Sequence, residues 1–111
     1  MSTAESSYLK VSSFLERSAQ VGLILPNGWF GRPYDNFLTV VGVFLEEEHI
    51  LVIEFERSFR LEVGYPFNAV IEGNVLVLSG FASARWEYFP FGETSIVRQR
   101  FTSGTCSLVS P

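Results

Sequence analysis

The sequence of 111 residues contains only one cysteine, Cys106, and only one histidine, His49. A single cysteine excludes an internal disulfide, which agrees with a reducing compartment. One cysteine and one histidine also fail to supply the ligands of a structural zinc site. We therefore expect no metal and no cofactor, with Cys106 as a small buried strand residue and His49 in a solvent-facing turn.

Long hydrophobic runs are missing as well. No apolar stretch approaches the roughly 18 to 20 residues that a membrane-crossing helix needs. The first ten residues carry serine, threonine, Glu5 and Lys10 in place of the basic and apolar regions of a signal peptide. We expect no membrane span and no membrane partner, and we place the protein in the cytoplasm.

Positive charge is scarce, because eight lysines and arginines stand against twelve aspartates and glutamates, for a net charge of −4. Proteins that bind duplex nucleic acid normally show the opposite balance, since phosphate neutralisation supplies most of their affinity. We therefore expect no nucleic-acid partner. The acidic segment from Glu46 to Glu72 and the mildly basic one after Glu93 either form solvated faces or meet head to tail between molecules.

Hydrophobic residues make up 47% of the sequence, which is enough apolar surface for a folded core, and the length suits one domain, residues 1–111. In residues 1–20, apolar side chains recur at helical spacing, and capping-box patterns begin at Ser2 and Ser13. Gly22 follows as a stop signal. We expect one N-terminal helix that packs on a β domain formed by residues 21–111.

From residue 36 onwards, β-rich runs alternate with turn signals at intervals of about ten residues. No interval has room for a crossover helix, so the pattern predicts a small antiparallel β-sandwich or barrel of about eight strands. Alternation of apolar and charged residues predicts a hairpin that pairs Glu54 with Arg60. Gly73-Asn74 predicts a second hairpin that pairs Val70 with Val77, in strands that are apolar on both faces. Those strands are expected to be central or covered by the helix or a partner.

The most distinctive stretch is G-W-F-G-R-P-Y-D-N, residues 28–36. Trp29, Arg32, Tyr34 and Asp35 are residue types that dominate binding hot spots. The same stretch also suits a structural loop in which Trp29 and Phe30 plug the end of the core and Arg32 pairs with Asp35. The stretch is no phosphate loop, because the Gly-Lys-Ser/Thr that should follow is absent.

A second aromatic stretch contains Trp86, Tyr88, Phe89 and Phe91. Alternation places Ala84, Trp86 and Tyr88 on one face of a strand, so we expect Trp86 in the core, whereas Phe89 and Phe91 flank Pro90 in a loop tip. The chain has eleven phenylalanines in all, more than a core of this size readily absorbs beside its other aromatic residues. Part of this aromatic surface should therefore meet a partner chain or a ligand.

No nucleophile with a base and no carboxylate pair stands in a recognisable motif, so we lean against an enzyme. The leading hypothesis is a non-catalytic β-protein that acts through protein–protein interaction, as a homodimer or an adaptor. The first alternative is a small-molecule or carbohydrate binder that uses the loop of residues 28–36. An enzyme of unknown class is the second alternative.

Overall fold

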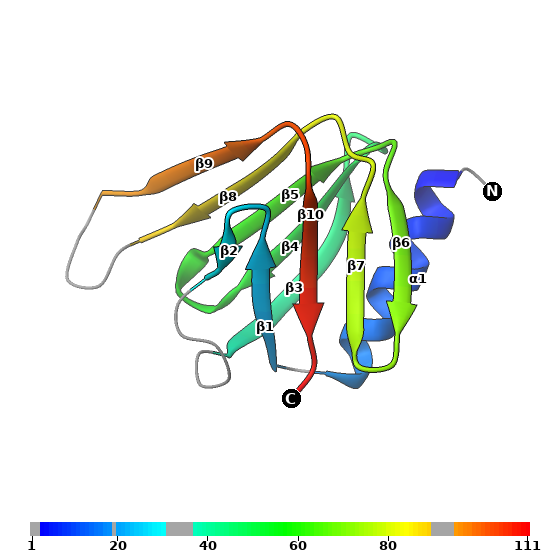
Figure 1. Ribbon diagram of the computed structural model, residues 1–111, viewed down its shortest axis with the longest axis horizontal. Helices are drawn as coiled ribbons and strands as arrows, with labels where there is room; N and C mark the ends of the chain where they lie inside the picture. Colours follow the sequence, from blue (N-terminus) through cyan, green and yellow to red (C-terminus); the bar gives the residue numbers. More distant parts are fainter. Residues whose placement is uncertain (1–2, 19, 31–36, 90–94) are drawn as a thin grey trace.

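The structure is a computed structural model that describes residues 3–18, 20–30, 37–89 and 95–111. It contains one α-helix, a short 3-10 helix and a ten-stranded antiparallel sheet (Figure 1). The helices are α1 (Thr3–Arg17) and η1 (Glu56–Ser58). The strands are β1 (Gln20–Leu25), β2 (Gly28–Trp29), β3 (Leu38–Glu46), β4 (Ile50–Phe55), β5 (Arg60–Gly64), β6 (Asn68–Glu72), β7 (Val75–Ser79), β8 (Ala84–Tyr88), β9 (Val97–Phe101) and β10 (Thr105–Val109).

The strand order is β6-β7-β10-β1-β3-β4-β5-β8-β9, and β2 pairs with β1. The sheet folds over itself, so that a front layer of β6, β7, β10, β1 and β2 covers a back layer of β3, β4, β5, β8 and β9 (Figure 1). The layers are joined where Gln20 pairs with Thr39 and Val21 with Leu38. The antiparallel, mainly β fold with an N-terminal helix is confirmed, and the sheet is open, with ten strands where about eight were expected.

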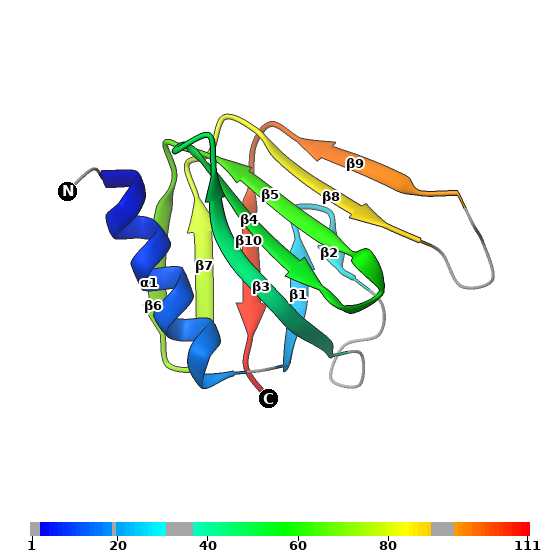
Figure 2. The ribbon, with the colours of Figure 1, turned by 180° about the vertical axis from the view of Figure 1, so that it is seen from behind.

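Helix α1 closes the side of the molecule where β6 and β3 diverge (Figure 2). Its apolar stripe puts Val11, Phe14 and Leu15 into the core. The Tyr8 hydroxyl donates to the carbonyl of Val43 in β3 at 3.3 Å, and Lys10 Nζ donates to the carbonyl of Ala69 in β6 at 3.1 Å. The helix therefore fastens both layers together at this side. Among the described residues, no helix combines the length and apolar character that crossing a membrane requires.

The core between the layers contains an aromatic cluster, which we define as Phe30, Phe55, Phe59, Trp86 and Tyr88. The ring centroid of Phe30 lies 4.9 Å from those of Trp86 and Tyr88, in edge-to-face arrangements. Such arrangements match the positive ring edge of one aromatic residue to the negative face of another. The cluster fills the end of the core opposite α1.

Both predicted hairpins have the expected registers, since Glu54 pairs with Arg60 and Val70 pairs with Val77. The second hairpin, β6–β7, lies at one end of the strand order and is therefore not a central pair. Its inward side chains face the core and α1, whereas Val70 points outwards and remains 46% exposed. The helix thus covers one face of this hairpin and leaves the other open.

Candidate interaction surfaces

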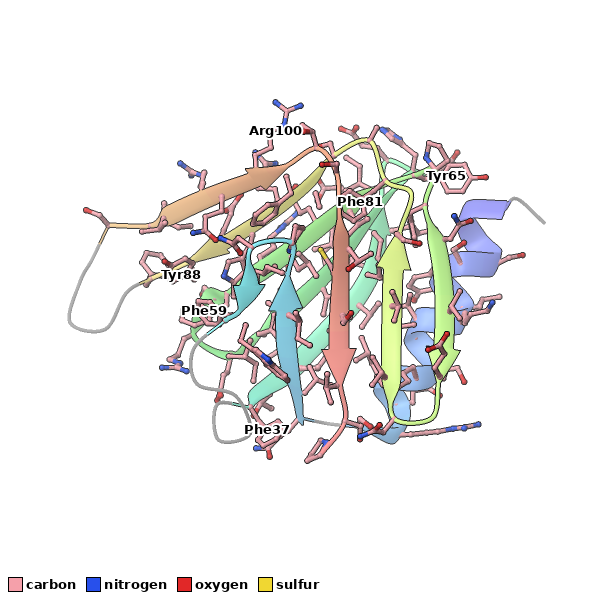
Figure 3. All side chains as sticks on the ribbon, viewed as in Figure 1. Phe37, Phe59, Tyr65, Phe81, Tyr88 and Arg100 are labelled. Atoms are coloured by element: carbon pink, nitrogen blue, oxygen red, sulfur yellow. The ribbon has the colours of Figure 1, made fainter. Side chains whose placement is uncertain are left out.

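Trp29 and its neighbour Phe30 point to opposite sides of the front layer. An added Cβ atom at Gly22 would lie 3.2 Å from Cζ3 of Trp29 and 3.7 Å from Cε1 of Phe37, so both rings lie on the outside, over Gly22. Figure 3 shows Phe37 near the lower end of β1. Phe30, by contrast, enters the aromatic cluster. The expectation that Trp29 and Phe30 both plug the end of the core is confirmed for Phe30 and wrong for Trp29, because adjacent strand residues face opposite ways.

The remaining candidates of the first aromatic loop, Arg32, Tyr34 and Asp35, lie outside the described residues, so the expected pairing of Arg32 with Asp35 stays a prediction. In the second stretch, Trp86 is fully buried and is not available to a partner or ligand in this conformation. Tyr88 and Phe89 are half-buried and pack against the core. Phe91 lies outside the described residues.

The outer surface of the front layer, called the front face below, is nearly free of charge. Of the residues that the structure places there, only Glu72, at the edge on β6, is charged. In strand order, the front face consists of Asn68, Val70 and Glu72; Val75, Val77 and Ser79; Thr105, Ser107 and Val109; Gln20, Gly22 and Ile24; and Trp29. Register aligns one row across all five strands, from Val70 through Val77, Ser107 and Ile24 to Trp29.

The outer surface of the back layer, called the back face below, is strongly charged. Its charged members are Glu46, Glu54, Arg60, Glu62, Arg85, Glu87, Arg98 and Arg100. Four acidic and four basic side chains thus share this face, and most of them form ion pairs with each other. The two faces of the same sheet therefore differ in charge, although the back face also carries apolar side chains such as those of Phe44 and Val52.

Arg60 and Arg85 organise the ion pairs around Glu62. Arg60 Nε donates to Glu62 Oε2 at 2.9 Å, and Arg85 Nη2 donates to Glu62 Oε1 at 2.7 Å. Burial alone would lower the pKa of Arg60, but its hydrogen bonds and the charges of Glu46 and Glu62 raise it. The hydrogen bond to Glu62 likewise raises the pKa of Arg85. The carboxylate of Glu62 is thus already bound by two guanidinium groups.

The described residues offer little for catalysis or metal binding. His, Cys, Asp and Glu side chains in this part of the chain form no group that would hold a metal ion. His49 is exposed in a turn, as expected, and its Nδ1 lies 2.7 Å from the carbonyl oxygen of Glu47. Cys106 is buried in β10, also as expected.

We expect the Cys106 thiol to be unreactive in the folded protein. Burial raises its pKa to about 12, so at pH 8 the thiolate is a fraction on the order of one in ten thousand. Dithiobis(nitrobenzoate) should release no colour from the native protein over minutes and should label one thiol per chain in urea. Fast labelling without denaturant would contradict this burial.

The front face was not recognised as a unit from the sequence, because its members come from five strands whose order depends on long-range pairing. The one local signal for this face was the alternation of valine with leucine in residues 75–78, which indicates a strand with apolar side chains on both of its faces. No family model, curated protein or solved structure matches the chain, so its function has to be inferred from the front face and the back face.

Proposed function

We propose that this protein is a non-catalytic interaction protein that forms a homodimer through its front face. The observation that carries the proposal is the row from Val70 to Trp29, which crosses five strands without a charged side chain. Valine, isoleucine and tryptophan on an open sheet face leave apolar area in water. Burial of that area contributes about 25 cal/mol per Å².

The back face provides an internal comparison. An antiparallel sheet commonly has one face on the core and one solvated face, and the solvated face is usually polar. The back face carries ion pairs beside apolar side chains such as those of Phe44 and Val41, whereas the front face carries Glu72 as its one charged side chain among the described residues. Because both faces belong to the same sheet, the difference supports a covered front face and a solvated back face.

A second copy of the chain is the partner that the front face suits best. Glu72 lies on the edge strand β6, so two front faces can meet with this carboxylate near the rim and no charge between the sheets. Two sheets pack face to face at a distance of about 10 Å when apolar side chains line both of them. A two-fold dimer needs only one self-complementary surface and is the commonest oligomer.

Helix α1 does not cover the front face. It contacts β6 and β3 at the side of the molecule and leaves the outward side chains of β7 and β10 uncovered. In the proposed homodimer both back faces remain exposed to solvent. An adaptor needs such exposed surfaces to contact further proteins. We keep the cytoplasm as the proposed compartment, and the single buried thiol of Cys106 suits a reducing one.

Light scattering coupled to size exclusion tests the homodimer. At tens of micromolar, the expected mass is near twice the chain mass of 12.5 kDa. Val77→Arg should give the monomer mass, because it puts a charge at the centre of the interface. Val41→Arg is the matched control: Val41 is 67% exposed and lies on β3 in the back layer, so this variant should remain a dimer.

The fold of each variant is checked by urea unfolding, and Val70→Arg, at an exposed position, replaces Val77→Arg if the latter fails to fold. A monomer mass for the unchanged protein at tens of micromolar would contradict the proposal. A dimer that survives both Val77→Arg and Val70→Arg would place the interface elsewhere and would contradict it as well.

A further inference from the structure

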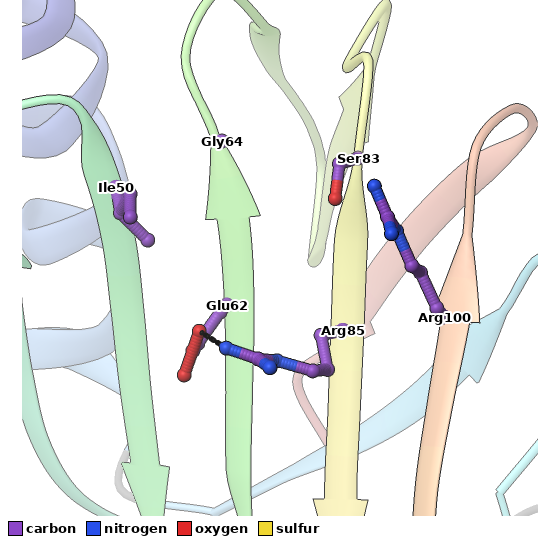
Figure 4. Close-up of a pocket in the computed structure, with 6 residues that line it drawn as sticks. All are labelled: Ile50, Glu62, Gly64, Ser83, Arg85 and Arg100. Carbon is purple, nitrogen blue, oxygen red and sulfur yellow. Dashed lines mark hydrogen bonds and ion pairs between the residues drawn. The ribbon is translucent and has the colours of Figure 1, made fainter.

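A hollow of about 270 Å³ lies on the back face, over β5 and β8 (Figure 4). It is lined by Ile50, Glu62, Gly64, Ser83, Arg85 and Arg100. Figure 4 shows Ile50 on one side of Gly64, and Ser83 and Arg100 on the other. The hollow therefore has an apolar end on β4 and a polar, positively charged end at β8 and β9, with the bare backbone of β5 between them.

Gly64 keeps the hollow open, and the backbone does not require a glycine at this position. Its φ lies outside the left-handed region, and an added Cβ atom would meet the Ser83 carbonyl oxygen at an ordinary 3.6 Å. A glycine in a strand costs stability and often marks a site where a ligand or another chain approaches the backbone closely. What this glycine provides is the space above β5, between Ile50 and Ser83.

The hollow has one positive charge to spare. Its charged lining residues are Glu62, Arg85 and Arg100. Glu62 already accepts hydrogen bonds from Arg85 at 2.7 Å and from Arg60 at 2.9 Å. Arg100, by contrast, forms no ion pair with any residue that the structure describes. A single carboxylate therefore balances the hollow, whereas a phosphate dianion would bring a second negative charge close to Glu62.

The register of β8 and β9 also favours an anion at Arg100. Arg85 and Arg100 lie directly opposite each other in this pairing, and like charges in such positions are destabilising. The side chain of Arg85 forms ion pairs with Glu62 and Glu87. The guanidinium group of Arg100 lies beside Ser83 instead (Figure 4). An anion there would accept hydrogen bonds from Arg100 and from the Ser83 hydroxyl, and its charge would offset the repulsion.

We propose that this hollow binds a small monocarboxylate with a short, unbranched apolar chain. The carboxylate accepts hydrogen bonds from the guanidinium group of Arg100 and the hydroxyl of Ser83, and the carbon chain lies over Gly64 and contacts Ile50. Neighbouring strands lie about 4.8 Å apart, so β4 and β8 are separated by roughly 10 Å, which an acid of about four to six carbons can span. The hollow is on the back face, so it stays open in the proposed homodimer.

Titration with sodium pentanoate, followed by ¹H–¹⁵N NMR at neutral pH and physiological ionic strength, tests the proposal. We expect saturable shifts at the amides of Gly64, Ser83 and Arg100, with a dissociation constant of about 1 mM or below. Arg100→Gln should weaken binding about tenfold, as loss of a charge-assisted hydrogen bond would. Arg98→Gln is the matched control. It removes an equal charge from the same face of β9 without lining the hollow, so the affinity should stay within about twofold.

Filling the hollow gives an independent readout. Gly64→Val should abolish binding, because valine suits a strand and its side chain would occupy the space between Ile50 and Ser83. Gly42→Val is the matched control: Gly42 lies on β3 outside the hollow, with nothing within 4 Å of an added Cβ atom, so the affinity should not change. Urea unfolding checks the fold of both variants, and Gly64→Ala, which should weaken binding, replaces Gly64→Val if the latter fails to fold. Val77→Arg should retain binding, so that failure of the homodimer and failure of this site are distinguishable.

Ligand variants test the two ends of the hollow separately. Pentanamide, which lacks the charge, should bind about tenfold more weakly than pentanoate, and acetate, which lacks the chain, severalfold more weakly. Equal binding of either compound would overturn the proposal, as would an unchanged affinity of Arg100→Gln or of the folded Gly64 variant.

Two other ligands distinguish other sources of the same charge. Tighter binding of inorganic phosphate would assign the hollow to phosphate groups, and tighter binding of N-acetylglutamate amide would assign it to a side chain of another protein. Either result would overturn the proposal. The absence of saturable shifts at tens of millimolar pentanoate would overturn it too.

Discussion

Replacement of Trp86 with alanine is expected to lower the free energy of unfolding by about 3–5 kcal/mol, the usual range for removal of a buried aromatic side chain. Trp86 has no exposed surface and lies at the centre of the aromatic cluster. Its ring centroid is 4.9 Å from that of Phe30, 5.6 Å from that of Phe55 and 5.9 Å from that of Phe59. Alanine would leave a cavity that rings from both layers border.

Trp29→Ala is the matched control for Trp86→Ala, because it removes the same side chain from the outer surface of the front layer. We expect it to cost about 1 kcal/mol or less in a monomeric background such as Val77→Arg. Urea unfolding followed by circular dichroism measures both variants. A loss below about 1 kcal/mol for Trp86→Ala would show that this end of the core is not packed as described.

Gly104→Ala is expected to be the second most damaging substitution, with a loss of about 2–4 kcal/mol. Gly104 has a φ of +98°, which side chains of L-residues rarely adopt, and an added Cβ atom would lie 2.8 Å from Cβ of Pro26. The proline ring is rigid and cannot turn away. The alanine would therefore strain the β9–β10 turn and push it away from the β1–β2 turn.

Gly73→Ala separates the two causes. Gly73 also has a positive φ, +60°, but nothing lies within 4 Å of its added Cβ atom. Its expected cost is about 1 kcal/mol, the backbone part alone. Equal losses for the two variants in urea unfolding would show that the contact with Pro26 does not restrain the turn.

Local sequence signals predicted the local parts of the fold correctly. The helical spacing of Val11, Leu15 and their neighbours predicted α1, and the two hairpins have the registers that alternation and Gly73-Asn74 indicated. These elements depend on residues a few positions apart, so their patterns can be read directly. The change of period after the helix also predicted the mainly β fold.

The order of the strands could not be read in this way. β1 lies between β10 and β3, and β10 lies between β7 and β1, although most of the chain separates β1 from β10. No local pattern encodes such pairings. The contrast between the front face and the back face results from this order, because it gathers Ile24, Val77 and Val109 from distant segments onto one surface.

Residue type alone was a poor guide to the candidate site. Both tryptophans are candidates by residue type because tryptophan is common at interfaces, yet Trp29 is on the outer surface. Trp86 is in the core, as its alternation with Ala84 and Tyr88 predicts. Arg100 was not selected, because an isolated arginine in a strand has no motif. It borders a hollow on the back face only because the strand order brings Ser83 and Gly64 close to it.

The most direct test of the homodimer is an isotope-filtered NOE experiment on an equal mixture of ¹³C-labelled and unlabelled protein, which reports only contacts between copies. The front-face interface predicts intermolecular NOEs at the methyl groups of Val70, Val77, Val109 and Ile24 and none at Val41. Intermolecular NOEs confined to back-face side chains, or none at all at millimolar protein, would contradict a homodimer formed through the front face.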